Sequence, residues 1–266
     1  MNPPSPRHVL KRADLMVDEI KRWIVAGDVR PGELLPNEAE LRRLFSMSKG
    51  TVREALKSLE MQGLVSLKAG PKGGAMVTEV DFARTFQLLQ NHFFFQPVDL
   101  GQIYAMRRLL EPELAAAATL ALTEADLAEL EASLADCVHG DGSPDARLAQ
   151  GSEDLAFHDL IARACPNVLL RFQCLALNEM LRRLVVLGRD LDGMDGLGQA
   201  NQAAHHQIMA AFRARDPEAS RQAMAEHIAE AEAHVTRLGA TYRGRLLLDA
   251  DFVTFVRLAS VGLSPA

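Results

Sequence analysis

The stretch Ser48-Lys-Gly-Thr-Val-Arg-Glu-Ala-Leu-Lys-Ser-Leu-Glu-Met-Gln-Gly63 has the pattern of one helix, which begins after a serine cap and ends at a glycine. Its apolar residues recur at the spacing i, i+3, i+4 and i+7, which predicts one buried face. These residues are Val52, Ala55, Leu56 and Leu59. Lys49, Arg53 and Lys57 recur every four residues on another face. Such a cationic stripe is typical either of a solvated helix face or of a helix that contacts nucleic acid.

Two further helical patterns precede this stretch. Residues 10–26 place apolar side chains at helical spacing, and Gly27 ends that helix. Asn37, with Glu40 three residues later, has the pattern of a capping box and predicts a second, short helix that ends just before the quoted stretch. Two short helices joined by so tight a turn predict a helix-turn-helix, in which the second helix enters the major groove of DNA. We therefore interpret the quoted stretch as a DNA-recognition helix.

The segment after this helix has strand patterns. Residues 64–68 and 76–80 predict two short strands, and residues 69–75 between them form a glycine-rich loop. Glycines allow the backbone to approach a phosphate closely. Residues 8–80 are therefore predicted to form a winged helix-turn-helix domain.

The composition separates this module from the rest of the chain. The chain has 266 residues, 48% hydrophobic and 24% charged, enough for one large or two ordinary domains. A net charge of -6 would argue against a nucleic-acid partner if it were evenly distributed. Residues 1–80, however, hold 13 Lys and Arg against 10 Asp and Glu, and the remainder holds 16 against 25. A basic N-terminal module thus precedes an acidic one.

The remaining residues predict a mostly α protein. From Phe82 onward the strand signals disappear, and the breaks between helical patterns indicate a bundle of about six helices over residues 81–240. Residues 241–266 form a C-terminal extension, which we expect to be helical. The three cysteines, Cys137, Cys165 and Cys174, lack paired spacing and fit reduced thiols. No apolar run is long enough to span a bilayer, so we expect a cytoplasmic protein without a membrane partner.

The N-terminal motifs resemble those of the GntR family of transcription regulators. The resemblance covers nearly all of residues 10–80 and includes Leu35-Pro-Asn-Glu-Ala-Glu-Leu41, Ser48 to Leu56 and Gly63-Leu-Val. It implies that Arg53 reads bases. The other DNA-binding candidates lie at the helix start, along its face and in the wing: Ser48, Lys49, Thr51, Lys57, Lys72, Gly73 and Gly74. Where the family usually has an arginine, this chain has Ala39.

One such module makes few contacts with DNA. An arginine such as Arg53 can donate two hydrogen bonds to guanine, whereas the lysines neutralise phosphates and set affinity without reading sequence. Selective binding usually requires a larger contact surface. We therefore expect a homodimer that binds a palindromic double-stranded operator.

A possible metal site lies in the helical module. Asp154 and His158 have the spacing i, i+4, so their side chains share one helical face. Taken alone, this pair more often belongs to an ordinary surface or core. The register of the module, however, resembles the FCD domain of FadR-type GntR regulators. That resemblance implies that Asp154, His158, His205 and His227 bind a divalent metal ion, which could be Zn, Ni, Fe or Mn.

The same resemblance implies a small-molecule effector, a carboxylate held near the metal. Arg107 and Asn167 are the effector-binding candidates. A plain ion pair between Arg107 and Glu111, one turn later, is the alternative for the arginine. The neighbouring His206 and the later His234 fall outside the metal-binding register.

Two other functions remain open from the sequence. His158 and Asp159 form the adjacent doublet of HD-type metal-dependent phosphohydrolases, although no suitably placed histidine precedes it. The chain could also be a constitutive DNA-binding dimer without an effector. We expect that the protein is not an enzyme and that it has no catalytic residue.

Overall fold

The computed structural model describes residues 11–70, 73–93, 96, 98–135, 144–187 and 197–237. Lys72, Cys137 and the predicted extension over residues 241–266 lie outside the described residues. The chain divides into two compact units, and the division falls after Gln87, inside helix α4 (Phe82–Phe93). Among the described helices, none has the length and apolar character needed to cross a membrane.

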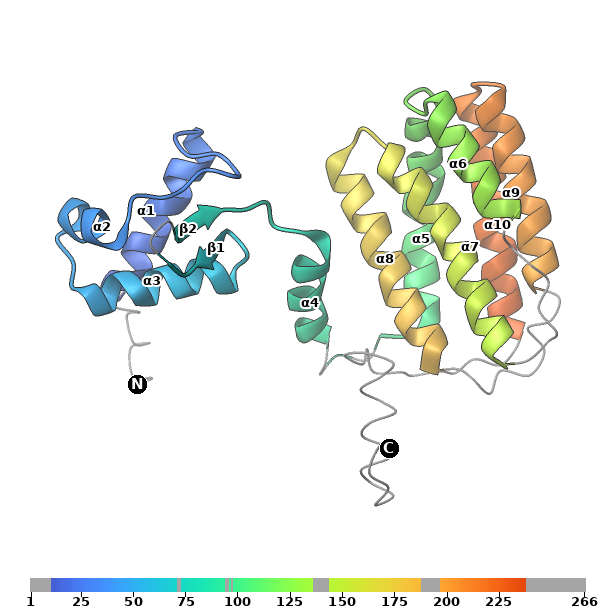
Figure 1. The fold of residues 1–266 in the computed structure, drawn as a ribbon. Coiled ribbons are helices and arrows are strands. Elements are labelled where there is room, and N and C mark those ends of the chain that lie inside the picture. The colour runs from blue at the N-terminus through green and yellow to red at the C-terminus, as the bar shows by residue number, and fades with distance from the viewer. Residues whose placement is uncertain are drawn as a thin grey trace, which may run out of the picture. The chain divides into compact units, whose positions relative to one another are not determined.

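The N-terminal unit is the predicted winged helix-turn-helix (Figure 1). Its elements follow in the expected order: α1 (Arg12–Ala26), α2 (Glu38–Phe45), α3 (Lys49–Met61), β1 (Val65–Lys68) and β2 (Gly74–Val77). The two strands pair antiparallel, with Val65 opposite Val77 and Lys68 opposite Gly74. The second strand begins and ends earlier than the sequence pattern predicts.

The caps and the buried face of α3 match their prediction. The Asn37 side chain accepts hydrogen bonds from the backbone N–H groups of Ala39 and Glu40, and Glu40 in turn accepts from the Asn37 N–H. Ser48 caps α3 by accepting a hydrogen bond from the Thr51 N–H at 3.1 Å. All four predicted core residues of α3 are buried: Val52, Ala55, Leu56 and Leu59. They pack against the apolar side of α1, so the opposite face of α3 is left to solvent.

The C-terminal unit is a helical bundle, seen as the group of long helices in Figure 1. Its helices are α5 (Leu100–Thr119), α6 (Glu124–Ala135), α7 (Pro144–Ala164), α8 (Val168–Leu187), α9 (Leu197–Arg213) and α10 (Pro217–Arg237). With α4, the described residues from 82 onward hold one helix more than the sequence predicts. The additional break, between α5 and α6, has no glycine or proline. Thr123 and Asp126 create it by capping α6 reciprocally.

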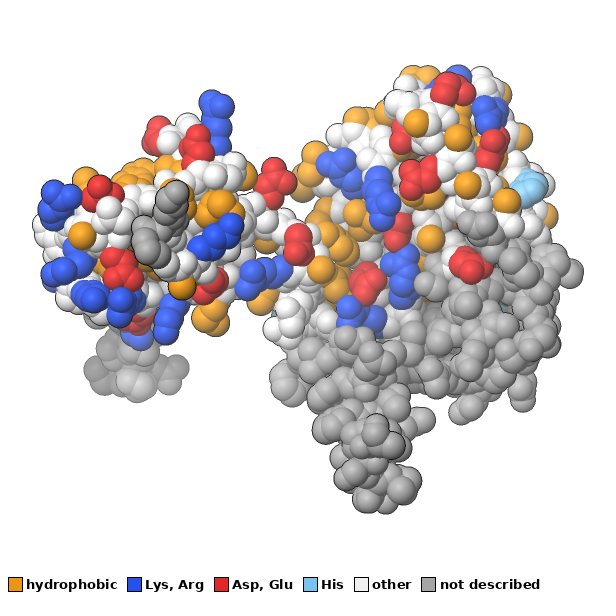
Figure 2. Space-filling model, in the orientation of Figure 1, with side chains coloured by type: hydrophobic (Ala, Val, Ile, Leu, Met, Phe, Trp, Pro, Cys, Tyr) orange, Lys and Arg blue, Asp and Glu red, His pale blue; other side chains and the backbone are white. Residues whose placement is uncertain are grey.

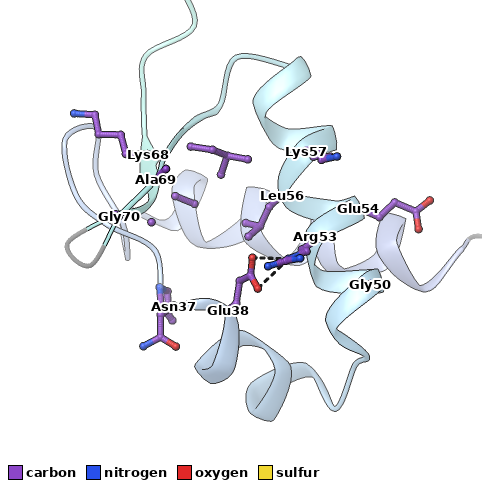
Figure 3. Close-up of a pocket in the computed structure, with 15 residues that line it drawn as sticks. Asn37, Glu38, Gly50, Arg53, Glu54, Leu56, Lys57, Lys68, Ala69 and Gly70 are labelled. Atoms are coloured by element: carbon purple, nitrogen blue, oxygen red, sulfur yellow. Dashed lines mark hydrogen bonds and ion pairs between the residues drawn. The ribbon is translucent and has the colours of Figure 1, made fainter.

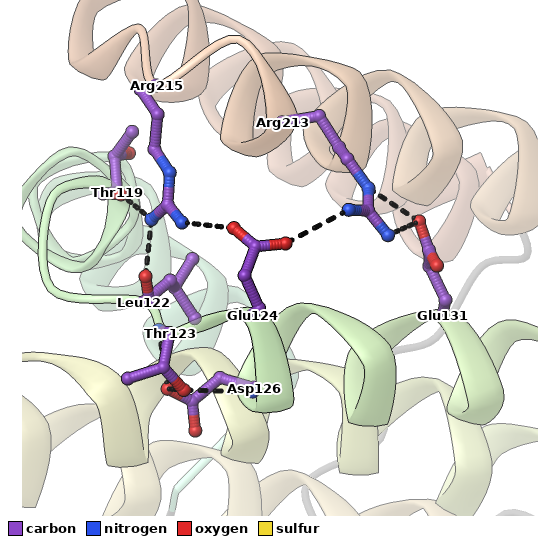
Figure 4. A network of polar contacts seen from close by, with 8 residues as sticks. All are labelled: Thr119, Leu122, Thr123, Glu124, Asp126, Glu131, Arg213 and Arg215. Carbon is purple, nitrogen blue, oxygen red and sulfur yellow. Dashed lines mark hydrogen bonds and ion pairs between the residues drawn. The ribbon is translucent and has the colours of Figure 1, made fainter.

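The corner between α9 and α10 is fastened to the corner between α5 and α6 by Arg215 (Figure 4). Its guanidinium donates to the carbonyl oxygens of Thr119, at 3.2 Å, and of Leu122. It also pairs with Glu124 at 2.9 Å. Thr119 is the last residue of α5 and Leu122 lies in the connection to α6, so both carbonyls are placed where helical hydrogen-bond partners are lacking. The backbone of Arg215 has a φ of 54°, so the chain accepts a conformation that is unfavourable for a side chain at this position.

We expect Arg215→Ala to lower the free energy of unfolding of the bundle by about 1–3 kcal/mol, because two backbone carbonyls lose a charged donor. Arg213→Ala is the control and should lower the free energy of unfolding much less, because the partners of Arg213 among the described residues are the exposed carboxylates of Glu124 and Glu131. Denaturant unfolding followed by circular dichroism measures both. Equal losses would show that Arg215 acts only as a surface ion pair.

Candidate DNA interface and metal centre

The outward face of α3 carries the predicted cationic stripe. Lys49, Arg53 and Lys57 are all exposed, in agreement with the spacing of the sequence. Figure 2 shows Lys and Arg side chains over the part of this unit formed by α2 and α3, with acidic side chains between them. The Ser48 hydroxyl lies 2.8 Å from the Thr51 hydroxyl, so both groups have a partner within the first turn of α3.

Arg53 is oriented by a residue of the preceding helix. Its Nε donates to both carboxylate oxygens of Glu38, at 3.0 and 3.1 Å (Figure 3). Among the residues that the structure describes, the two terminal nitrogens of Arg53 have no hydrogen-bond partner. These two nitrogens are the atoms that would contact a guanine edge. No pattern in the sequence indicated this role of Glu38.

A groove of about 910 Å³ lies between α3 and the wing (Figure 3). Arg53 and Lys57 line one side, and Lys68, Gly70 and Gly73 line the other. A Cβ at Gly73 would lie 2.1 Å from the Lys68 carbonyl oxygen, so the closed wing admits no side chain there. The predicted wing residue Gly73 therefore has a structural reason to be glycine that is independent of DNA.

Three of the four predicted metal ligands meet inside the bundle. His158 of α7, His205 of α9 and His227 of α10 offer nitrogens that all lie within 4.8 Å of one another. The Nε2 of His227 is 3.1 Å from that of His158 and 3.2 Å from that of His205. All three side chains are buried, with at most 4% of each residue exposed. Phe157 stacks on the His205 ring and closes one side of the cluster.

The surroundings keep two of these imidazoles, those of His205 and His227, neutral. Burial, together with the positive charge of neighbouring groups, holds the pKa of His205 and of His227 well below the ordinary value. A neutral imidazole has a lone pair on one nitrogen, which is the form that binds a metal. The Nδ1 of His205 is buried and has no hydrogen-bond partner among the described residues.

These residues fit a metal ion. Three buried Nε2 atoms point at one another, and a shared proton can satisfy only one pair of them at a time. A cation between them would accept a lone pair from each. The donor set, three imidazoles from three helices, is one that Zn, Ni, Fe and Mn can all use.

Asp154, the fourth predicted ligand, lies one turn before His158 on α7. Its carboxylate accepts a hydrogen bond from Asn201 Nδ2 at 2.8 Å and is not in the group within 4.8 Å. Burial raises the pKa of Asp154, and the hydrogen bond from Asn201 opposes this rise. The structure thus places Asp154 beside the histidines but with a partner of its own.

Arg107 is buried against Glu111, its predicted alternative partner. The Arg107 Nε lies 2.5 Å from Glu111 Oε1, and the guanidinium carbon lies 5.2 Å from the centre of the Tyr104 ring. The second oxygen of Glu111 is 2.6 Å from Nδ1 of His158. Burial by itself would raise the pKa of Glu111, but Arg107 and His158 hold it well below its ordinary value. The contact with His158 could not be read from the sequence.

Two other predicted residues have local roles. Asn167 is exposed, and its side-chain oxygen caps α8 by accepting hydrogen bonds from the N–H groups of Leu169 and Leu170, each at 3.1 Å. An effector contact of Asn167 stays a prediction. Asp159 pairs with Asn178 and Arg182 of α8, so it does not join His158 in the cluster. The doublet expected of an HD-type phosphohydrolase is therefore divided between two environments.

The chain matches two family models. Residues 13–76 match the model of bacterial regulatory proteins of the gntR family, and residues 102–230 match the FCD domain. The HTH-type transcriptional regulator LutR of Bacillus subtilis is 33% identical over 145 residues, which span 54% of this chain and 64% of that regulator. The galactonate operon transcriptional repressor of Escherichia coli is 26% identical over 226 residues, 83% of this chain and 95% of the repressor.

A solved structure has the same fold. The Streptococcus agalactiae GntR structure is similar with a TM-score of 0.59 and 22% sequence identity, over 83% of this chain and 99% of that chain. Both matched domains and the curated relatives are those of transcription regulators, so the phosphohydrolase alternative is excluded.

Proposed function

The chain belongs to the GntR family of bacterial regulatory proteins, with a DNA-binding domain followed by an FCD domain, and we propose that a carboxylate effector held by a metal ion controls its binding to an operator. The observation that carries the proposal is the convergence of three buried Nε2 atoms, from His158, His205 and His227.

The three histidines would hold a divalent ion, with Asp154 as the candidate fourth ligand. Such an ion, when bound, supplies a positive charge with positions open to a carboxylate if its coordination exceeds the protein ligands. Arg107 is the second group that could bind the carboxylate of the effector. Because its guanidinium already engages Glu111, an effector would reach it only by replacing that contact.

The effector class follows from this chemistry. A small carboxylate matches the charge of the proposed ion and of Arg107. The name of the E. coli relative refers to galactonate, which is a hydroxy acid, and this supports a hydroxy or sugar acid. An effector can shift DNA binding only by binding the competent and the incompetent arrangement with different affinity.

DNA recognition would come from two copies of α3. Arg53 would read bases, while Lys49, Lys57 and Lys72 would contact phosphates together with Ser48, Thr51 and the wing glycines. A two-fold dimer places two such helices on a palindromic site.

The experiment uses the full chain. We expect light scattering to give a dimer at micromolar concentration and selection from randomised duplexes to recover a palindrome. A panel of hydroxy and sugar acids should then change both the melting temperature and the operator affinity of the metal-loaded dimer. A monomer would contradict the two-fold model. A dimer whose operator affinity does not change with any of these acids would support the alternative of a constitutive DNA-binding protein without an effector.

A further inference from the structure

Glu111 is a fully buried carboxylate with no role among the proposed ligands. It lies on α5, and 0% of its side chain is exposed. One of its oxygens faces Arg107 one turn earlier at 2.5 Å, and the other faces Nδ1 of His158 on α7 at 2.6 Å. The carboxylate therefore links a buried cation to a proposed metal ligand on a different helix.

The chemistry of this contact determines where His158 carries its proton. An ionised carboxylate only accepts hydrogen bonds, so the nitrogen that faces it must be the protonated one. The two atoms are close but not aligned for a straight hydrogen bond, which leaves the attraction mainly electrostatic. With the proton on Nδ1, the lone pair is on Nε2, the atom that faces His227 at 3.1 Å.

We infer that Glu111 is a positioning residue that fixes the Nδ1–H tautomer of His158, so that its Nε2 is presented to a metal ion. Arg107 is the counter-ion that keeps Glu111 ionised in the interior. Carboxylates that orient histidine ligands in this way raise metal affinity without touching the ion. This inference rests on the proposed metal site.

The burial separates this arrangement from a simple helix ion pair. An i, i+4 pair on a helix surface needs no third partner and contributes a few tenths of a kcal/mol. Here both members lose their water, since 3% of the Arg107 side chain and 0% of the Glu111 side chain are exposed. Two buried charges require further polar partners, and the imidazole of His158, 2.6 Å from the Glu111 carboxylate, provides one.

The first measurement uses the unmodified full chain. The ¹⁵N shifts of the His158 ring, with and without Zn²⁺, should report a protonated Nδ1 in both states. A protonated Nε2 in the metal-free chain would overturn the inference, whatever any variant does.

The second measurement compares Glu111→Gln with Glu113→Gln. Glu113 is on the same helix, but its carboxylate is exposed and pairs with Arg221 at 2.8 Å. Competition of Zn²⁺ with a chelator should show affinity about 10–100-fold weaker in Glu111→Gln and unchanged in Glu113→Gln. If Glu111→Gln does not fold, the doubly neutral variant Arg107→Met/Glu111→Gln replaces it, because no unpaired charge then remains inside.

The outcomes distinguish this inference from the metal proposal itself. If the unmodified chain binds no Zn²⁺, the proposed site fails. If it binds Zn²⁺ and Glu111→Gln binds equally well, the site stands and the positioning role of Glu111 is refuted. A lower melting temperature with unchanged Zn²⁺ affinity would likewise assign Glu111 a purely structural role.

Discussion

Replacing His227 by alanine is expected to abolish specific metal binding, with a loss of affinity greater than about 100-fold. The Nε2 of His227 lies within 3.2 Å of both other imidazoles, so its removal takes away the group that the other two share. The expected loss exceeds the 10–100-fold typical of a residue that only orients a ligand.

The readout is the stabilisation that metal provides. Metal at about 100 times its dissociation constant should add about 2.7 kcal/mol to the unmodified chain, and the variant should lose this gain. His206→Ala is the matched control, because His206 adjoins a proposed ligand but is exposed. If untagged protein purified without chelator holds no metal, and added ions change neither melting curve, the cluster is structural.

The secondary structure of the N-terminal unit could be predicted almost entirely from the sequence, because its signals are local. The capping box at Asn37, the cap at Ser48 and the apolar spacing of α3 each involve residues within a few positions of one another. The role of Glu38 could not be predicted, because it depends on a contact that is not local. Its partner Arg53 is fifteen residues away, and only the docking of α2 on α3 brings them together.

The structure of the helical bundle was harder to predict at positions where tertiary contacts determine it. The break between α5 and α6 has only Thr123 and Asp126 as its signal, and Arg215 holds that corner from a distant part of the chain. At the candidate site, the three histidines named from the sequence register lie close together, and their binding of a metal stays a prediction. The register could not indicate Glu111, because an acidic residue one turn after Arg107 has the ordinary pattern of a helix ion pair.

The contact with Glu38 supports the base-reading role of Arg53 more strongly than the exposure of Arg53 alone does. An exposed arginine loses rotamer freedom when it binds a base, which opposes binding. Because Glu38 already binds the Nε of Arg53, part of this rotamer entropy is lost when the protein folds and not when it binds DNA. The terminal nitrogens of Arg53 remain available. The Ala39 side chain, next to Glu38, has no hydrogen-bond donor, so base reading by the N-terminal unit depends more heavily on Arg53.

Arg53→Ala should therefore weaken binding to the selected operator by about 1–3 kcal/mol per half-site, while affinity for random duplex changes much less. Lys57→Ala, one turn further along the same exposed face, should instead weaken binding to every sequence. It should also lower the slope of log affinity against log salt concentration by about one unit for each N-terminal unit bound. Titrations of both variants on operator and random DNA at several salt concentrations measure these effects. Equal losses on the two DNAs for both variants would mean that Arg53 contacts phosphate and that sequence is read by another residue.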